Sequence, residues 1–307
     1  MSKRIYKTNQ ADRKVELQQA MNKLEQGVQD VFKGKNFQDY LKFCARLPKY
    51  SLNNQILIML QDPKATICQS YNGWKAIGRT VKKGEKGIRI LAPNPFKVKK
   101  EQKVFDENGD QLFDQAGNPV MEIVEVPVMS YRLVSTFDVR QTEGADLPVN
   151  SVEELTAGVD GYSKLFDALT KASGVQVEFE NIESGAKGYY SVDRDIIVLN
   201  SGMSESQTLK TLIHETAHQM LHSKDALKGQ AKKSRYLKET EAESVAFVVC
   251  QHFGIDTSDY TFGYVAGWSE GKDLKELKQA LDTIRSTAAQ IIEKTEDILV
   301  EKKSGVA

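Results

Sequence analysis

The sequence predicts an α+β protein of two domains, and three observations support this fold class. Apolar residues at helical spacing occur over 10–60, the pattern changes to short strands punctuated by glycines from Ile67 onward, and the polar stretch 141–151 (QTEGADLPVNS) precedes a second mixture of helices and strands. The length of 307 residues is sufficient for two domains of ordinary size. We therefore predict domains at 1–140 and 152–307, joined by a linker at 141–151.

The individual elements follow from apolar spacing and from turn residues. In the first half we predict helices at 10–35, 37–47 and 52–60, a hairpin turn at 84–87 (GEKG) before a strand at 88–91, an exposed hairpin at 97–121 and a β-rich run at 122–139. In the second half we predict helices at 152–173, 205–222, 234–253 and 273–302, and strands at 175–180, 188–192 and 195–199.

The composition argues against several classes of protein. An apolar fraction of 40% is ordinary for a globular chain, and neither a run of 18 apolar residues nor a signal-peptide pattern is visible, so we expect a cytoplasmic protein without a membrane partner. The three cysteines, Cys44, Cys68 and Cys250, are far apart and form no CxxC pair, which argues against a disulfide scaffold and a cysteine zinc site. We expect buried, reduced thiols.

The net charge of zero hides an asymmetry between the two halves. Residues 1–100 contain 21 lysines and arginines against 7 acidic residues, a balance of +14, and the rest of the chain carries the compensating −14. This division is typical of a protein in which one part contacts a polyanion. The alternative is a set of solvated lysine faces.

The stretch TLIHETAHQMLH, residues 211–222, holds three of the four histidines of the chain. Ser204, followed three residues later by Gln207, predicts a capping box at the start of a helix. His214 and His218 are one helical turn apart, so their side chains project from the same face and can bind one metal ion. Two such imidazoles supply two corners of a tetrahedral Zn²⁺ site.

Glu215 follows the first of these histidines and is the predicted catalytic residue. In an HExxH sequence this glutamate is placed to hold and deprotonate a water molecule at the metal, and zinc lowers the pKa of that water from about 15.7 to about 7. The alternative is a packing helix with surface histidines. His222, a further turn along, is too far from His214 to share its metal, and we expect it to be a core or surface residue.

A third protein ligand is expected from the helix at 234–253. Its apolar stripe comprises Ala242, Ala246, Val249, Cys250 and Phe253. Extended backward, the stripe passes through Glu239 and Glu243, whereas Glu241 points elsewhere. Carboxylates in such positions are costly unless they are paired or bound to a metal. We predict Glu239 as the third ligand and Glu243 as a residue that orients a ligating histidine, with the reverse assignment open.

Together these motifs resemble those of a known family. LPKYSLNNQILIMLQ (47–61), YNGWKAIGRTVKKGEKGIRILAP (71–93) and STFDVRQTEG (135–144) are similar to the N-terminal domain of ArdC-type antirestriction proteins. HETAH and ETEAESVAF are similar to the two zinc helices of the metallopeptidase domain that follows it. The likeness extends over roughly residues 10–270, and it is weakest over 97–121 and the C-terminal helix.

The resemblance implies a single-stranded-DNA-binding N-terminal domain joined to a zincin-like metallopeptidase domain of the gluzincin type. It also implies that His214, His218 and Glu239 bind Zn²⁺ and that Glu215 is catalytic. Proteins of this family are carried by plasmids, conjugative elements or phages, where they are thought to protect incoming DNA from restriction. These expectations come from the resemblance and not from spacing or charge.

The first half has the residue types that single-stranded DNA needs. Nonspecific binding combines a basic groove for phosphates with aromatic rings on which bases stack, each stack contributing about 1–3 kcal/mol. The predicted DNA-binding residues are Tyr50, Tyr71, Trp74, Lys75, Arg79, Lys82, Lys83, Lys86 and Arg89. For Trp74 a place in the core is the competing interpretation.

The leading functional hypothesis is a DNA-associated zinc metallopeptidase with an unidentified protein substrate. The strand at 195–200, just before the metal helix, is expected to be the sheet edge that aligns an extended peptide. The rival hypothesis is a nonproteolytic DNA-binding shield protein whose zincin fold is structural. A metal-dependent nuclease is a third possibility, but the sequence lacks the additional carboxylates of a two-metal centre.

Overall fold

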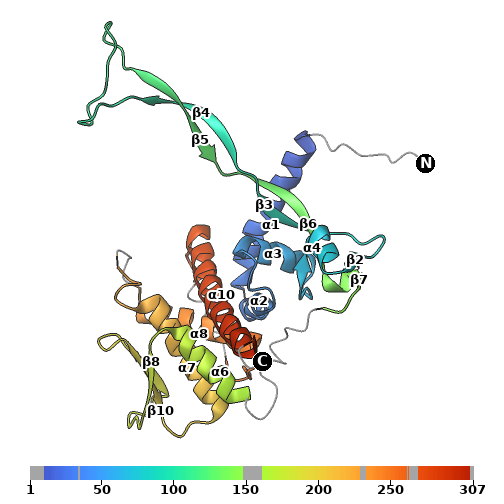
Figure 1. The fold of residues 1–307 in the computed structure, drawn as a ribbon, viewed down its shortest axis with the longest axis vertical. Helices are drawn as coiled ribbons and strands as arrows, with labels where there is room; N and C mark the ends of the chain where they lie inside the picture. The colour runs from blue at the N-terminus through green and yellow to red at the C-terminus, as the bar shows by residue number, and fades with distance from the viewer. Residues whose placement is uncertain are drawn as a thin grey trace.

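Helices and strands follow one another along the chain much as the sequence predicts. The computed structural model describes residues 10–33, 35–147, 161–228, 233–260, 262 and 269–304. The chain has a two-domain α+β architecture, as predicted (Figure 1). Among the described residues, no helix combines the length and apolar character needed to cross a membrane.

Four helices, two small sheets and a projecting two-stranded arm form the described part of the first half. The helices are α1 (Gln10–Val31), α2 (Asn36–Arg46), α3 (Leu52–Gln61) and α4 (Tyr71–Ala76). One sheet has the order β1–β6–β3, with β1 at Cys68–Gln69, β6 at Tyr131–Asp138 and β3 at Ile88–Pro93, and both pairings are antiparallel. The other sheet pairs β2 (Arg79–Val81) with β7 (Thr142–Gly144).

This topology corrects two predictions. The GEKG turn does not close a hairpin, because β2 before it pairs with β7 and β3 after it pairs with β6. The first part of the predicted linker is ordered, since Val139–Gln141 form a 3₁₀ turn and Thr142–Gly144 form a strand. The remainder of the linker from 148 onward lies outside the described residues.

The outer edge of β3 is covered by side chains from α3. The side-chain amide of Asn54 accepts from the Leu91 N–H and donates to the Leu91 carbonyl, both at 2.9 Å. Gln61 makes the same two contacts with the Arg89 backbone, also at 2.9 Å. An unpaired edge would leave these backbone groups without partners, so the two amides take the place of a neighbouring strand.

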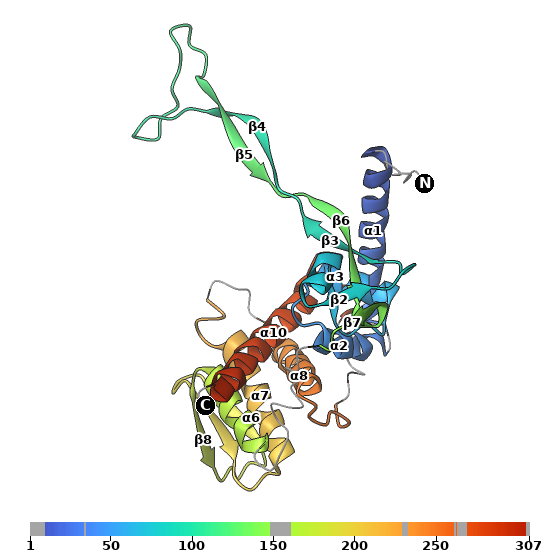
Figure 2. The same cartoon turned by 45° about the vertical axis from the view of Figure 1, so that its right-hand side comes forward.

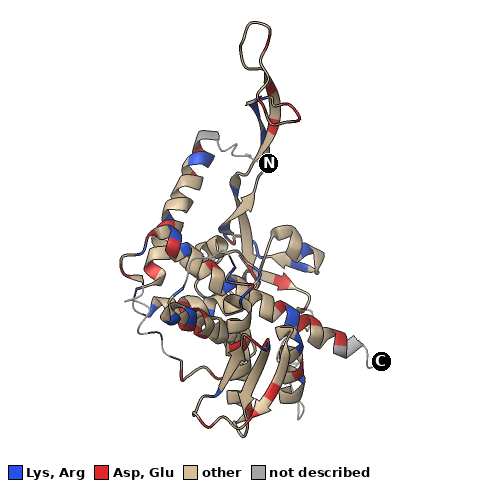
Figure 3. Cartoon of the chain, turned by 90° about the vertical axis from the view of Figure 1, so that its left-hand side faces the viewer, with Lys and Arg blue, Asp and Glu red and all other residues tan. Residues whose placement is uncertain are grey.

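A long two-stranded arm projects from the first half, as Figures 1 and 2 show. It is formed by β4 (Phe96–Lys103) and β5 (Met121–Val128), which pair in antiparallel register from Phe96↔Val128 to Lys103↔Met121. An exposed hairpin was predicted here, but its predicted bounds of 97–121 are too narrow, because the paired strands extend from Phe96 to Val128 and include the start of the predicted β-rich run at 122–139. The arm carries both signs of charge (Figure 3) and exposes large apolar side chains such as Ile123.

The described part of the second half is a three-stranded sheet at the outside of the molecule, with helices packed on one side of it (Figures 1 and 2). Its elements are α6 (Gly161–Ser173), β8 (Gln176–Glu180), β9 (Gly188–Ser191), β10 (Ile196–Asn200), α7 (Glu205–His222), α8 (Arg235–His252) and α10 (Leu274–Ser304). The sheet order is β8–β10–β9, with β10 parallel to β8 and antiparallel to β9. The predicted role of 195–200 as an edge strand is therefore wrong, because β10 is paired on both sides and β9 is an edge.

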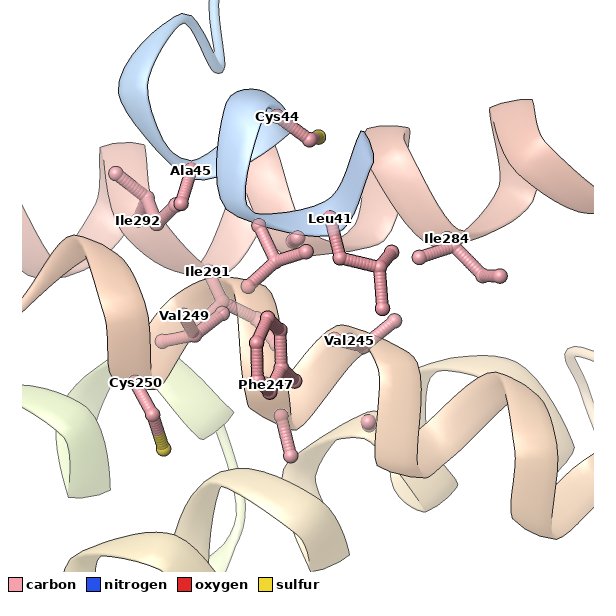
Figure 4. Close-up of a cluster of buried hydrophobic side chains, with 14 of the residues drawn as sticks. Leu41, Cys44, Ala45, Val245, Phe247, Val249, Cys250, Ile284, Ile291 and Ile292 are labelled. Atoms are coloured by element: carbon pink, nitrogen blue, oxygen red, sulfur yellow. The ribbon is translucent and has the colours of Figure 1, made fainter. Parts of the chain in front are cut away.

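The two halves share a hydrophobic core. Figure 4 shows Leu41 of α2 among side chains of α8 and α10, including Val245 and Ile284. His252 of α8 reinforces this junction, since its Nδ1 lies 2.9 Å from the Ala45 carbonyl of α2. The first domain therefore packs directly against the helix α8.

Candidate metal centre and active-site cleft

The helix α7 is fixed by its cap and by one buried stripe. The Ser204 hydroxyl accepts from the Gln207 N–H at 3.3 Å, as a capping box requires, but the Gln207 side chain contacts Lys187 and Thr211 instead of returning to the cap. Leu212 is completely buried, as are its stripe neighbours Ile213 and Ala217. The histidines follow this stripe on an adjoining face, where they meet α8.

Three donor atoms converge between α7 and α8. The Nε2 atoms of His214 and His218 are 3.1 Å apart, and Glu239 Oε2 lies 3.6 Å from the first and 3.4 Å from the second. Neighbouring donors around a tetrahedral ion with bonds of 2.0–2.1 Å are about 3.3 Å apart. The triangle already has the dimensions of three ligands of one small divalent cation.

The two candidate carboxylates of α8 occupy different positions. Glu239 belongs to the group of three that could hold a metal ion, with about half of its side chain exposed. Hydrogen bonding to His214 and His218 holds the pKa of Glu239 far below its usual value, so this carboxylate is an anion. Glu243, one turn further along α8, instead lines the cleft beside Glu215.

Glu215 lies buried next to His214, one of the three converging donors. Its side chain is 7% exposed, and this burial raises its pKa although His214 and His218 oppose the shift. The backbone amide of Tyr190 on β9 also contacts its carboxylate. A raised pKa increases the basicity of the carboxylate, which is what proton abstraction at neutral pH requires.

A cleft runs past these residues on both sides. A hollow of about 370 Å³ on one side reaches Lys210, Thr211, Asp259 and Tyr260, and one of about 650 Å³ on the other reaches Lys233, Arg235 and Lys238. His214 and Glu215 border both hollows, and so does Gly188 of the edge strand β9. An extended chain lying along β9 would therefore pass directly over Glu215.

Two residues near the candidate metal ligands make contacts that the sequence analysis did not predict. His222 is buried, as a core residue would be, and lies outside the group of three donors, but its Nδ1 lies 3.0 Å from His218 Nδ1. Glu241, expected to point elsewhere, is 3% exposed and places Oε2 3.0 Å from His222 Nε2. The regular spacing of His214, His218 and His222 on one helix face was a signal for the first of these contacts.

Of the three aromatic residues predicted to bind DNA, two have hydrogen bonds inside the fold and one is exposed. Trp74 is completely buried and its indole N–H donates to the Phe137 carbonyl at 2.8 Å, so the prediction that it stacks on a base is wrong. Tyr50 is half-buried and its hydroxyl donates to the Cys68 carbonyl at 2.9 Å, which makes it a structural residue. Tyr71 is 52% exposed on α4 and keeps an accessible ring.

The predicted basic residues also differ in their surroundings. Lys75, Lys83 and Lys86 are exposed, on α4 and on the segment between β2 and β3. The Arg79 guanidinium donates to Thr142 of β7 and to the carbonyl of Ala145, which follows β7, and the Lys82 ammonium donates to the Arg140 carbonyl at 3.0 Å. Arg89 is exposed, and its Nη2 atom lies 3.4 Å from Oε2 of Glu16.

The fold and the site define a two-domain protein whose second domain holds three side chains that could bind one metal ion, next to the buried Glu215. Residues 12–126 match the N-terminal domain of the anti-restriction factor ArdC, and residues 170–256 match the IrrE N-terminal-like domain of the peptidase M78 family. These matches, in this order, confirm the resemblance to ArdC-type antirestriction proteins.

Individual relatives include longer proteins. An uncharacterized protein of Bacillus anthracis is 28% identical over 284 residues, which cover 81% of this chain and 46% of the relative. DNA primase TraC of Escherichia coli is 25% identical over 229 residues, covering 72% of this chain and 15% of the primase. The chain thus spans less than half the length of these curated relatives.

The solved structures with similarity include two crystal structures of the antirestriction protein ArdC from plasmid R388. The metal-free structure is 22% identical, with a TM-score of 0.45 and coverage of 82% of this chain and 85% of ArdC. The Mn(II)-bound structure is 19% identical, with a TM-score of 0.45 and coverage of 94% and 99%.

Proposed function

We propose that this chain is a DNA-associated zinc metallopeptidase in which His214, His218 and Glu239 hold Zn²⁺ and Glu215 is the general base. The observation that carries the proposal is the triangle of donor atoms at 3.1, 3.4 and 3.6 Å beside a buried glutamate of raised pKa. Two imidazoles and one carboxylate leave a tetrahedral ion a fourth position for water or substrate.

The chemistry is divided between the ion and the chain. A bound Zn²⁺ would acidify a water molecule and polarise a peptide carbonyl. Glu215 would remove the proton of the attacking water, which its raised pKa favours, and the protonated carboxyl group would then donate this proton to the departing amine. Burial keeps Glu215 from bulk solvent, so the proton stays near the scissile bond.

The edge strand β9 is the element that would align the substrate. It pairs with β10 along one edge, and no described strand pairs with its other edge. Gly188 of β9 lines both hollows beside Glu215, and Tyr190 lines the larger one. A peptide added along the free edge gains backbone hydrogen bonds whatever its side chains are. This arrangement favours an extended, unfolded segment of a protein as substrate.

The test is a comparison of the zinc-loaded wild-type chain with Glu215→Gln on an unfolded protein such as reduced casein. We expect wild type to produce discrete fragments, detected by mass spectrometry, and Glu215→Gln to keep its zinc but cleave at least 100-fold more slowly, since it cannot accept the proton. Cleavage of casein at the wild-type rate by a zinc-loaded Glu215→Gln variant would refute the proposed mechanism.

The same variant addresses the rival hypothesis of a nonproteolytic DNA shield. If proteolysis is the protective activity, Glu215→Gln abolishes protection of transferred DNA from restriction in recipient cells. Protection that survives in Glu215→Gln would favour the shield.

The DNA-binding part of the proposal rests on exposed side chains of the first half. Tyr71, Lys75, Lys83 and Lys86 combine an accessible ring with unburied ammonium groups. A Lys83→Ala, Lys86→Ala double variant should bind an oligo(dT) strand more weakly and with a shallower dependence on salt, because fewer counterions are released. Unchanged affinity and salt slope would place the DNA site elsewhere.

A further inference from the structure

We propose that His222 and Glu241 are positioning residues that orient the metal ligand His218 through a continuous chain of hydrogen bonds. This inference rests on the proposed metal site, and it adds two residues that the zinc-binding motif does not contain. The chain runs from His218 Nδ1 to His222 Nδ1 at 3.0 Å, and from His222 Nε2 to Glu241 Oε2 at 3.0 Å. Lys233 closes it, with Nζ 2.8 Å from both oxygens of Glu241.

Metal binding would fix the direction of every hydrogen bond in this chain. When Nε2 of His218 is a ligand, the remaining proton of its neutral ring is on Nδ1 and is donated to His222 Nδ1. His222 Nδ1 is then an acceptor, so its own proton is on Nε2 and is donated to the carboxylate of Glu241. Each nitrogen thus has one role, and the orientation of the His218 ring is set by α8.

The burial of the pair argues that it serves more than solubility. The side chains of His222 and Glu241 are 5% and 4% exposed. Placing a histidine and a carboxylate there costs free energy that an apolar pair would not, unless the groups are fully hydrogen-bonded. Both groups are fully hydrogen-bonded in this structure. A metal-bound histidine usually donates directly to a carboxylate. Here the imidazole of His222 lies between His218 and the carboxylate of Glu241.

The competing explanation is that the pair merely joins α7 to α8, and α8 itself offers a matched control. His252 is also a partly buried histidine of α8 that contacts a glutamate, with Nε2 2.9 Å from Glu296 Oε1. It lies at the junction with α2 and does not contact the metal ligands. A purely structural role predicts the same behaviour for His222→Ala and His252→Ala.

The experiment measures the zinc dissociation constant of each full-length variant by competition with a chromophoric chelator, beside thermal unfolding of the zinc-free protein. We expect about 10- to 100-fold weaker zinc binding for His222→Ala. His222→Asn should recover part of the affinity, because its amide oxygen can accept from His218 Nδ1–H. Glu241→Gln, the milder change, should weaken binding less than His222→Ala, and His252→Ala should lower thermal stability with zinc affinity unchanged.

The outcomes separate this inference from the proposed function. Wild-type zinc affinity in His222→Ala and Glu241→Gln, or equal losses in His252→Ala, would overturn the positioning role while leaving the peptidase proposal intact. Failure of the wild-type chain to bind zinc would overturn both. If His222→Ala does not fold, the affinity of Glu241→Gln decides, since this change keeps nearly the same side-chain volume but removes the negative charge that His222 and Lys233 contact.

Discussion

At the scale of single residues, the convergence of donor atoms, and not low exposure, separates the proposed ligands from their neighbours, since Glu239 is about half exposed and Glu241 is buried. His214 and His218 could be predicted from their spacing alone, because one helical turn fixes their common face. The choice between Glu239 and Glu243 depends on how α7 crosses α8, which no local pattern encodes. The contact between His222 and Glu241 depends on that same crossing and was missed for the same reason.

The side chain of Asp138 joins two segments of the first half, at Thr66 and Arg140, by hydrogen bonds. Its side chain is completely buried, and it accepts hydrogen bonds from the Thr66 and Arg140 amides at 2.7 and 3.0 Å and from Arg140 Nε at 2.6 Å. Burial alone would raise the pKa of Asp138, but these donors outweigh it and lower the pKa below its usual value.

Asp138→Asn should therefore destabilise the protein by about 2 kcal/mol at pH 7, the contribution of hydrogen bonds to a buried charged group. Because the pKa is lower in the folded state, this contribution is present above the unfolded value of about 3.9 and is lost as the pH falls through the folded pKa. Urea unfolding of both proteins between pH 7 and pH 3 should show the difference shrinking below pH 4. A constant difference would mean that the charge of Asp138 is unimportant.

Elements were predicted more reliably than their pairings. The helix α7 begins and ends where its cap and apolar stripe predict, at Glu205 and His222, because both signals are local. The pairing of β3 with β6 joins Ile88 to Thr136, and nothing near GEKG indicates that partner. The edge role was assigned to 195–200 instead of to β9 for the same reason, since strand order is a property of the sheet.

The close approach of β9 to α7 yields an element-scale prediction. A Cβ at Gly188 would lie 2.7 Å from Thr211 Cγ2 and 2.8 Å from the Val198 carbonyl oxygen. Gly188→Ala must displace β9 from α7 or β10, which should cost about 1–3 kcal/mol in thermal or urea unfolding. The exposed neighbour Lys187→Ala is the control and should cost less than about 0.5 kcal/mol. Equal stability of the two variants would show that β9 is not held against α7.

At the scale of the whole molecule, the two domains are joined through a common core. Leu41 of α2 is completely buried and packs among residues of α8 and α10 (Figure 4). The charge asymmetry of the sequence indicated two functions but not this junction, because a charge count does not reveal which apolar faces meet. The helix that supplies Glu239 is thus also the helix that contacts the first domain.

Leu41→Ala should consequently destabilise both domains and not the first alone. Removing a fully buried leucine side chain costs about 2–5 kcal/mol, and amide hydrogen exchange should accelerate in α7 and α8 together with α2. The exposed Leu60 on α3 provides the control, and Leu60→Ala should leave exchange in α7 nearly unchanged. Accelerated exchange confined to the first domain would contradict a shared core.

The most direct test of the central claim is the zinc content of the full chain by elemental analysis, for wild type beside Glu239→Gln and Glu243→Gln. The geometry predicts one zinc per chain in wild type and in Glu243→Gln, and loss of zinc from Glu239→Gln, with all three proteins folded. Absence of zinc from the wild-type chain after reconstitution, or its loss from Glu243→Gln and not from Glu239→Gln, would contradict the account.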